Sequence, residues 1–211
     1  MSRASPSTER QSARQRRIEE QRRKIESARR QQRRKRFMVG GIAVAIAALL
    51  IVAVLVFFPR PVSGQMHQVP AEQGSHVSTP EELVYQTRPP SSGPHFGQVP
   101  SQSDYRVYDQ PVSPGLWVHM LEHGSIVILY RPDLCDQTCR AQLGDVYDSA
   151  PASTVFRIRK LAVIPWTDMD HAIAVVAWGY IDEMDQVDKD RIMADYKSKV
   201  DAPTAPERGA L

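Results

Sequence analysis

The chain has 211 residues, two cysteines and a formal net charge of +3, which is divided sharply between two parts. Residues 1–36 contain fourteen Lys or Arg and four Glu, so this part has a net charge of +10 and residues 37–211 have one of −7. The basic part lacks aromatic side chains that could stack on bases, which argues against nucleic-acid binding. The sequence also lacks a G-x-x-x-x-G-K nucleotide loop and the G-x-S-x-G motif of one hydrolase class.

An uncharged apolar run follows at residues 37–58. A helix of this length, rising about 1.5 Å per residue, spans about 33 Å, which matches the hydrocarbon core of a bilayer. We therefore expect a transmembrane helix, since a helix in a soluble core is rarely apolar on every face for so long. The basic part before it predicts a cytoplasmic N-terminus in contact with anionic lipids, with residues 59–211 outside the cell membrane. A cleaved signal peptide is the alternative, but both segments exceed its usual lengths, so we favour an uncleaved, single-pass signal anchor.

The part after this anchor divides into a linker and a domain. Pro, Gly, Ser and Gln dominate residues 59–75, which predicts the linker. Residues 76–211 are numerous enough for one compact exported domain with its own core. Within it, Thr87–Tyr105 is rich in Pro, Gly and Ser and predicts a long loop, either ordered or disordered. The tail Asp201–Leu211 is expected to be loose.

Hydrophobic periodicity predicts alternating strands and helices in the rest of the domain. The expected strands are Ser125–Tyr130, Thr154–Arg159 with an extension to Ile164, and Ala172–Tyr180; the expected helices are Pro132–Ser149 and Asp185–Val200. This order predicts an α+β fold, with helices packed on a small mixed or antiparallel sheet.

An H-x-x-E-H pattern is formed by His119, Glu122 and His123. In a helix these positions share one face, so both imidazoles can reach one metal ion, whereas in a strand the two histidines lie about 13 Å apart. Gly124 fits a helix stop directly after them. Inverted zincins have the same pattern, in which Glu122 would activate water at a zinc ion held by both histidines. We disfavour this hydrolase interpretation because only about one helical turn fits before the next strand.

Three further histidines, His76, His95 and His171, are candidate ligands in the same domain. Neutral imidazole is a common ligand of zinc and copper. A single loop histidine is more commonly a hydrogen-bonding group. The alternative is therefore a buried hydrogen-bond network without a metal, in which Glu122 orients one of the rings.

Cys135 and Cys139 are the two cysteines of the chain, four positions apart. Oxidising conditions outside the cytoplasm favour a disulfide between them. A redox-active pair is less expected, because the spacing is C-x-x-x-C instead of C-x-x-C, and a metal-binding dithiol remains an open alternative.

Several of these segments together resemble the DUF3105 family, a group of uncharacterised, mostly bacterial and often membrane-anchored proteins. The resemblance rests on PPSSGPHF (Pro89–Phe96), VHMLEHGSIVILYRP (Val118–Pro132), IPWTDMDHAIAVVAWG (Ile164–Gly179) and APE (Ala205–Glu207). The positions that match the family's recurrent ones are Pro90, Ser92, Gly93, His95, His119, Glu122, His123, Gly124, Tyr130, Pro132, Trp178 and Gly179. The resemblance implies an extracytoplasmic domain in which His95 meets the VH-x-LEHG turn, and it supplies no reaction.

The leading hypothesis is a single-pass membrane protein whose exported domain binds a transition metal, copper or zinc. The expected ligands are His95, His119 and His123, with His171 or His76 completing the set and Glu122 orienting a ligand or serving as one. The alternatives are a non-enzymatic envelope scaffold and a zinc-dependent hydrolase. We favour a binding protein over an enzyme.

Overall fold

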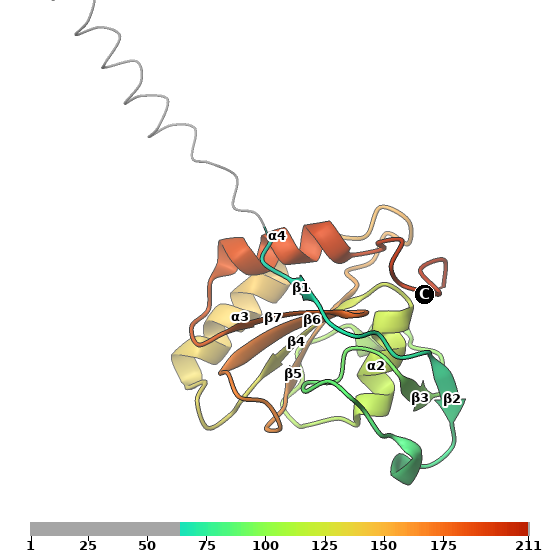
Figure 1. The fold of residues 1–211 in the computed structure, drawn as a ribbon. Helices are drawn as coiled ribbons and strands as arrows, with labels where there is room; N and C mark the ends of the chain where they lie inside the picture. Colours follow the sequence, from blue (N-terminus) through green and yellow to red (C-terminus); the bar gives the residue numbers. More distant parts are fainter. Residues whose placement is uncertain (1–63, 211) are drawn as a thin grey trace, which may run out of the picture. The chain divides into compact units, whose positions relative to one another are not determined.

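A mixed five-stranded sheet forms the centre of the computed structural model, which describes residues 64–210 (Figure 1). The strands lie in the order β1-β7-β6-β4-β5, and their bounds are His67–Gln68 for β1, Ile126–Tyr130 for β4, Leu161–Pro165 for β5, Ile173–Ala177 for β6 and Tyr180–Met184 for β7. β4 pairs with β5 in parallel, and the other neighbours pair antiparallel. With α-helices packed on this mixed sheet, the predicted α+β fold class is confirmed for the described part of the chain.

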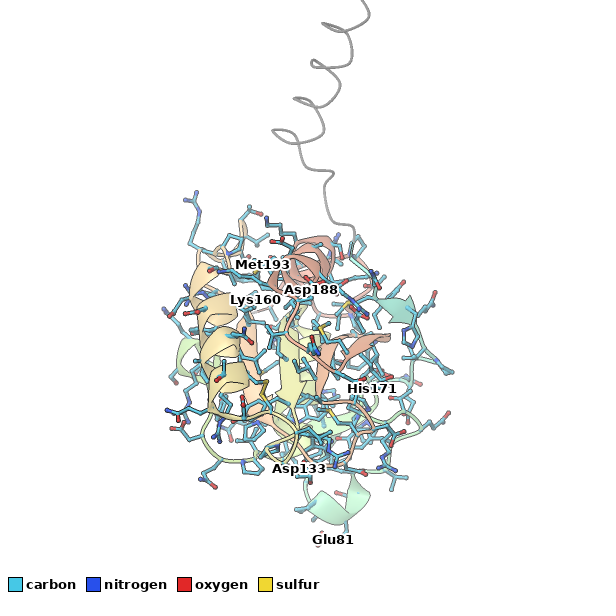
Figure 2. The ribbon with its side chains drawn as sticks, turned by 90° about the vertical axis from the view of Figure 1, so that its left-hand side faces the viewer. Glu81, Asp133, Lys160, His171, Asp188 and Met193 are labelled. Carbon is cyan, nitrogen blue, oxygen red and sulfur yellow. A yellow bond between two sulfur atoms is a disulfide. The ribbon has the colours of Figure 1, made fainter. Side chains whose placement is uncertain are left out.

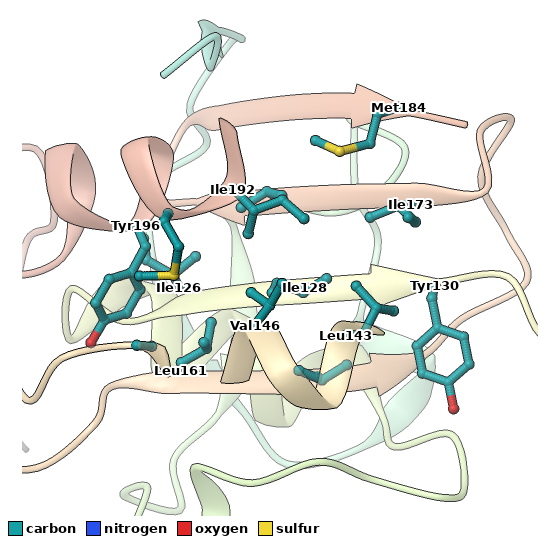
Figure 3. Packing of buried hydrophobic residues seen from close by; sticks show 14 of the residues in the cluster. Ile126, Ile128, Tyr130, Leu143, Val146, Leu161, Ile173, Met184, Ile192 and Tyr196 are labelled. Carbon is teal, nitrogen blue, oxygen red and sulfur yellow. The ribbon is translucent and has the colours of Figure 1, made fainter. Parts of the chain in front are cut away.

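Helices cover both faces of the sheet. α3 (Gln137–Ser149) and α4 (Lys189–Lys199) lie on one face, and α2 (Pro114–Glu122) lies on the other (Figure 1). Side chains of β4 alternate between two cores: Ile126, Ile128 and Tyr130 pack toward α3 and α4 (Figure 3), while Val127 and Leu129 pack toward α2. Because both faces are covered, every residue of β4 is buried, which explains its continuous apolar run.

The helix that carries the H-x-x-E pattern is longer than the single turn that we expected. α2 begins after Ser113, whose side-chain oxygen accepts a bond from the N–H of Gly115, and Pro114 takes the first helical position. It ends in a Schellman motif, in which the N–H groups of Gly124 and Ser125 donate to carbonyls of the last turn. Gly124 has a φ of +80°, a conformation that favours glycine. This motif leads the chain directly from α2 into β4.

The predicted strand Ala172–Tyr180 is in fact two strands. β6 and β7 are joined by the two-residue turn Trp178–Gly179, and Gly179 has a φ of +69°. The apolar pattern did not mark this boundary, because β6 is buried on both faces and shows no alternation.

Three other element boundaries differ from the prediction. Thr154–Arg159 forms turns and no strand, and the strand is the stretch that we had treated as its extension, β5. α3 and α4 both begin later than expected, because Asp136 and Asp188 cap them by accepting bonds from the N–H groups of Cys139 and Arg191.

The described part of the predicted linker, residues 64–75, belongs to the fold. β1 pairs with β7, and the N–H of Met66 donates to the side chain of Asp195 in α4 at 3.1 Å. Farther along, β2 (Ser75–Val77) pairs in parallel with β3 (Pro94–Phe96). The Pro-rich stretch that contains β3 is therefore the ordered one of the two alternatives.

The predicted loose tail is bound to the end of α2. The N–H of Asp201 donates to the carbonyl of Gly124, and the N–H of Glu207 donates to the carbonyl of Glu122, both at 2.9 Å. We call residues 201–210 the C-terminal segment. Its backbone bonds bring it against the turn that follows the H-x-x-E pattern.

The predicted basic segment (residues 1–36) and transmembrane helix (37–58) lie outside the described residues. Within residues 64–210, no helix has both the length and the apolar character needed to cross a membrane.

Candidate metal centre

Three chain segments bring four of the predicted ligands together. His76 in β2 and His95 in β3 are direct register partners in a parallel pair, so their side chains leave the same face, and their ring centroids are 5.0 Å apart. His119 and Glu122 lie one helical turn apart on α2 and point toward this pair. One ligand atom from each of the four residues can be chosen so that all lie within 4.8 Å of one another.

The centre of this inner cluster is a contact between an imidazole and a carboxylate. Nε2 of His95 lies 2.8 Å from Oε2 of Glu122, and both side chains are buried. The ring of His119 is 4.6 Å from that of His95 and 5.2 Å from that of His76. His119 is buried and His76 is exposed, so the cluster reaches the surface at β2.

Two backbone carbonyls orient the buried rings. Nδ1 of His95 lies 2.9 Å from the carbonyl of Gly93, and Nδ1 of His119 lies 2.7 Å from that of Phe96. A carbonyl only accepts, so each Nδ1 must carry the hydrogen, and Nε2 is the nitrogen that can offer a lone pair to a metal. Histidines that bind metals commonly have such a partner on the second ring nitrogen.

The cluster shifts the pKa values of its members in opposite directions. Burial opposes the charged form of His95, but the contact with Glu122 and the Gly93 carbonyl outweigh burial and raise its pKa. Burial likewise opposes the charge of Glu122, yet the His95 contact and the other imidazoles lower its pKa below the usual range. The pKa of His119 is lowered, first by burial and then by the neighbouring histidines. The cluster therefore favours an ionised carboxylate beside a neutral His119, which are the ligand forms that a metal ion requires.

Two glycines allow the segments to approach each other this closely. A Cβ at Gly74 would lie 2.1 Å from Oε1 of Glu122, and one at Gly115 would lie 2.7 Å from the ring of Phe96. The first glycine makes room for the carboxylate, and the second lets α2 pack on β3.

A second group shares His119 with the inner cluster. Ligand atoms of His119, His123 and Glu207 also lie within 4.8 Å of one another, and Nε2 of His123 is 3.4 Å from Oε2 of Glu207. The side chain of His123 is buried, whereas that of Glu207 is 52% exposed. Sequence reasoning did not select Glu207 as a ligand, although the APE motif that contains it contributed to the family resemblance.

The H-x-x-E-H pattern is thus divided between the two groups. Glu122 faces the inner cluster and is in contact with His95, while His123 faces Glu207. An inverted zincin needs its glutamate available as a base beside a metal held by both histidines of the motif. The observed arrangement does not favour that role for Glu122.

One predicted ligand, His171, lies elsewhere. His171 precedes β6 at the end of the sheet where β4 finishes, whereas α2 enters β4 at the opposite end. Its Nδ1 lies 3.1 Å from Oδ1 of Asp185, and the two side chains are 44% and 73% exposed. Figure 2 labels it well apart from Lys160, which marks the end near α2. The structure therefore brings His76 to the cluster and not His171.

Cys135 and Cys139 form a disulfide at the start of α3, with Cα atoms 5.2 Å apart. This pairing leaves no free thiol in the described residues, so the dithiol alternative for a metal site does not apply to this structure.

The fold and the site define a class of protein: an α+β domain with a buried histidine–glutamate cluster where a helix end meets a small parallel strand pair. The chain belongs to the family described as "Protein of unknown function (DUF3105)", whose model matches residues 76–211. The resemblance that we drew from the sequence is thereby confirmed. A search of curated proteins and a search of solved structures each found no match.

Proposed function

We propose that this domain binds one transition-metal ion, zinc or copper, through His76, His95, His119 and Glu122. The observation that carries the proposal is the convergence of four ligand atoms from three chain segments to within 4.8 Å. Three imidazoles and one carboxylate suit zinc or copper, whereas magnesium and calcium prefer oxygen ligands throughout.

The surroundings of the cluster also support a metal. Both buried rings are oriented through Nδ1 by backbone carbonyls, which leaves Nε2 to face the other ligands. The positive charge of an ion would be offset by the carboxylate of Glu122, whose pKa is already lowered. Entry of the ion would take the place of the proton between His95 and Glu122.

In this proposal the domain works outside the cell membrane, held there by a single N-terminal anchor. The support for this location is the apolar run at residues 37–58 and the basic residues before it.

The test is elemental analysis of the full-length protein after loading with zinc or copper and removal of free ions. We expect one tightly held ion per chain, and loss of that ion in His119→Ala. His171→Ala is the matched control, because it removes the same side chain outside the cluster and should retain the ion. A well-folded wild type without stoichiometric metal would contradict the proposal. Loss of the ion in His171→Ala together with its retention in His119→Ala would also contradict it.

A second candidate function is a metal-free scaffold, and one observation favours it. Nε2 of His95 already lies 2.8 Å from the carboxylate of Glu122, and Nδ1 lies 2.9 Å from the carbonyl of Gly93, so the ring has protein neighbours on both sides without an ion. In that case His95→Ala should lower the free energy of unfolding by about 1–3 kcal/mol, with or without added zinc. If the metal proposal is correct, added zinc stabilises the wild type and not the variant.

A further inference from the structure

The histidine–glutamate region contains two groups of ligand atoms, and they overlap at one residue. The inner cluster combines His119 with His76, His95 and Glu122, and the second group combines it with His123 and Glu207. Each group contains at least two imidazoles and exactly one carboxylate, so each offers the same classes of ligand to a divalent cation.

His119 can serve only one ion at a time. Its Nδ1 is engaged with the carbonyl of Phe96 at 2.7 Å and must keep its hydrogen there. Bridging two ions would require both ring nitrogens to lose their hydrogens and would break this bond. The two groups are therefore alternative positions around one fixed imidazole.

The carboxylates of the two groups differ in their access to solvent. The side chain of Glu122 is 8% exposed and lies against His95 of β3, whereas that of Glu207 is 52% exposed. Glu207 is nevertheless held in place, because its N–H donates to the carbonyl of Glu122 at 2.9 Å.

A buried lysine fixes the segment that carries Glu207. Nζ of Lys160 donates to Oδ1 of Asp201 at 2.9 Å, to the carbonyl of Ala210 and to that of His123. One ammonium group thus joins both ends of the C-terminal segment to the turn that contains His123. The backbone that carries the second carboxylate is therefore a positioned part of the fold.

We propose that the bound ion has two positions that share His119: an inner one with His76, His95 and Glu122, and an outer one with His123 and Glu207. This inference rests on the proposed function and deepens it. The ion moves between the two positions by exchanging the other ligands while His119 stays attached. A divalent transition metal thereby passes between a buried position and a solvent-facing carboxylate. Such an arrangement suits a protein that exchanges its ion with the surroundings better than it suits a protein that keeps a permanent structural ion.

The experiment uses Co²⁺ as a visible probe for the metal site in the full-length protein, with affinity and d–d absorption measured together. The variants are His76→Ala, Glu207→Gln and the combination of both. His76 and Glu207 are exposed, so neither substitution removes a buried packing group. Glu122→Gln provides a second way to weaken the inner position with little change of shape.

We expect the wild type to bind one Co²⁺ per chain, and Glu207→Gln to weaken binding less in the wild-type background than in a background whose inner position is weakened. His76→Ala should still bind one Co²⁺, with a changed spectrum, because the ion moves to the outer position. When Glu207→Gln is added to His76→Ala, Co²⁺ binding should weaken by at least about tenfold relative to His76→Ala alone. The same loss is expected when Glu207→Gln is added to Glu122→Gln.

Three results would overturn the inference. If Glu207→Gln has no effect in either weakened background, the outer position does not exist. Two Co²⁺ ions per wild-type chain would contradict the sharing of His119. If the wild type binds neither Co²⁺ nor zinc, the proposed function itself fails, and this outcome differs visibly from the first two because both of them retain binding in the wild type.

Discussion

Single residues decide whether the histidines form a metal site, and the sequence indicated only some of them. The i, i+3 spacing of His119 and Glu122 was readable as one helical face. His95 could be connected to them only through the family resemblance, because the pairing of β2 with β3 depends on chain segments far from α2. Glu207 lies 84 positions after His123, in a tail without periodicity, so no local pattern could have selected it. His171 was selected only as a further histidine of the same domain, and the fold places it beside Asp185 at the other end of the sheet.

Gly74 is the residue whose small size the cluster requires most directly. Gly74→Ala places a Cβ where Oε1 of Glu122 now lies, at a separation of 2.1 Å. We expect the carboxylate to be displaced, with a loss of about 1–3 kcal/mol in the free energy of unfolding and a loss of zinc retention. Urea unfolding and elemental analysis measure the two effects.

The matched control for this substitution is Gly144→Ala in the middle of α3, where a Cβ meets nothing within 4 Å. Alanine has the higher helix propensity, so this variant should gain about 0.5–1 kcal/mol and retain zinc. Equal effects of the two substitutions would contradict the role given to Gly74.

Asp195 makes the stability of the fold depend on pH. Its carboxyl is fully buried beside Asp182, and burial followed by that neighbour raises its pKa to about 7. As the pH rises, the unfolded chain releases the carboxyl proton of Asp195 first, and the folded protein keeps this proton to a higher pH. The stabilisation is therefore complete below about pH 4 and is lost as the pH rises through about 7.

Asp195→Asn removes this dependence, since an amide keeps an acceptor for the N–H of Met66 and does not ionise. We expect the variant to be more stable than the wild type at pH 8 by about 2 kcal/mol, and the difference to shrink toward pH 4.5. Urea unfolding at both pH values is the measurement, with the exposed Asp190→Asn on the same helix as control. A constant difference across this pH range would refute the assignment.

Secondary-structure elements were predicted best where one pattern governed a whole segment. β4 was located to within one residue, because a continuous β-branched run between two covered faces has few other interpretations. The hairpin of β6 and β7 was missed because β6 shows no alternation, so only Gly179 could have marked the turn. The predicted strand Thr154–Arg159 failed because its apparent alternation arises from turns that precede the true strand, β5. Caps decided where α3 and α4 begin, and each region contains more than one aspartate that could serve as the cap.

The C-terminal segment is the element whose attachment can be tested by one substitution. Lys160→Met leaves Asp201 without its ammonium partner and releases the carbonyls of His123 and Ala210. Removing one partner of a buried ion pair typically costs about 3–5 kcal/mol, so we expect a loss near the lower limit because Asp201 keeps its bond from Ser153.

A freed segment should also be cleaved by trypsin after Arg208 faster than in the wild type, as followed by mass spectrometry of the C-terminus. Lys189→Met is the control, because Lys189 is exposed and bonds only to the hydroxyl of Ser149 among the described contacts. Cleavage at the same rate in Lys160→Met and the wild type would show that the lysine does not hold the segment.

At the scale of the whole molecule, the sequence predicted the class of fold but not the limits of the domain. The family match begins at residue 76, yet residues 64–75 add a strand to the sheet and close the region around Gly74. Composition alone suggested a linker there. A strand of two residues is too short to show a periodic pattern, and a single glycine such as Gly74 does not reveal that another segment packs against it. The membrane anchor and the exported location remain predictions from the apolar run and the charge asymmetry.

The most direct test of the central claim is X-ray absorption spectroscopy at the zinc edge of the zinc-loaded, full-length protein. We predict a first shell of nitrogen and oxygen atoms at about 2.0–2.1 Å, imidazole scattering from about three rings and no sulfur. Sulfur ligands at about 2.3 Å, or a shell of water without imidazole scattering, would contradict the account.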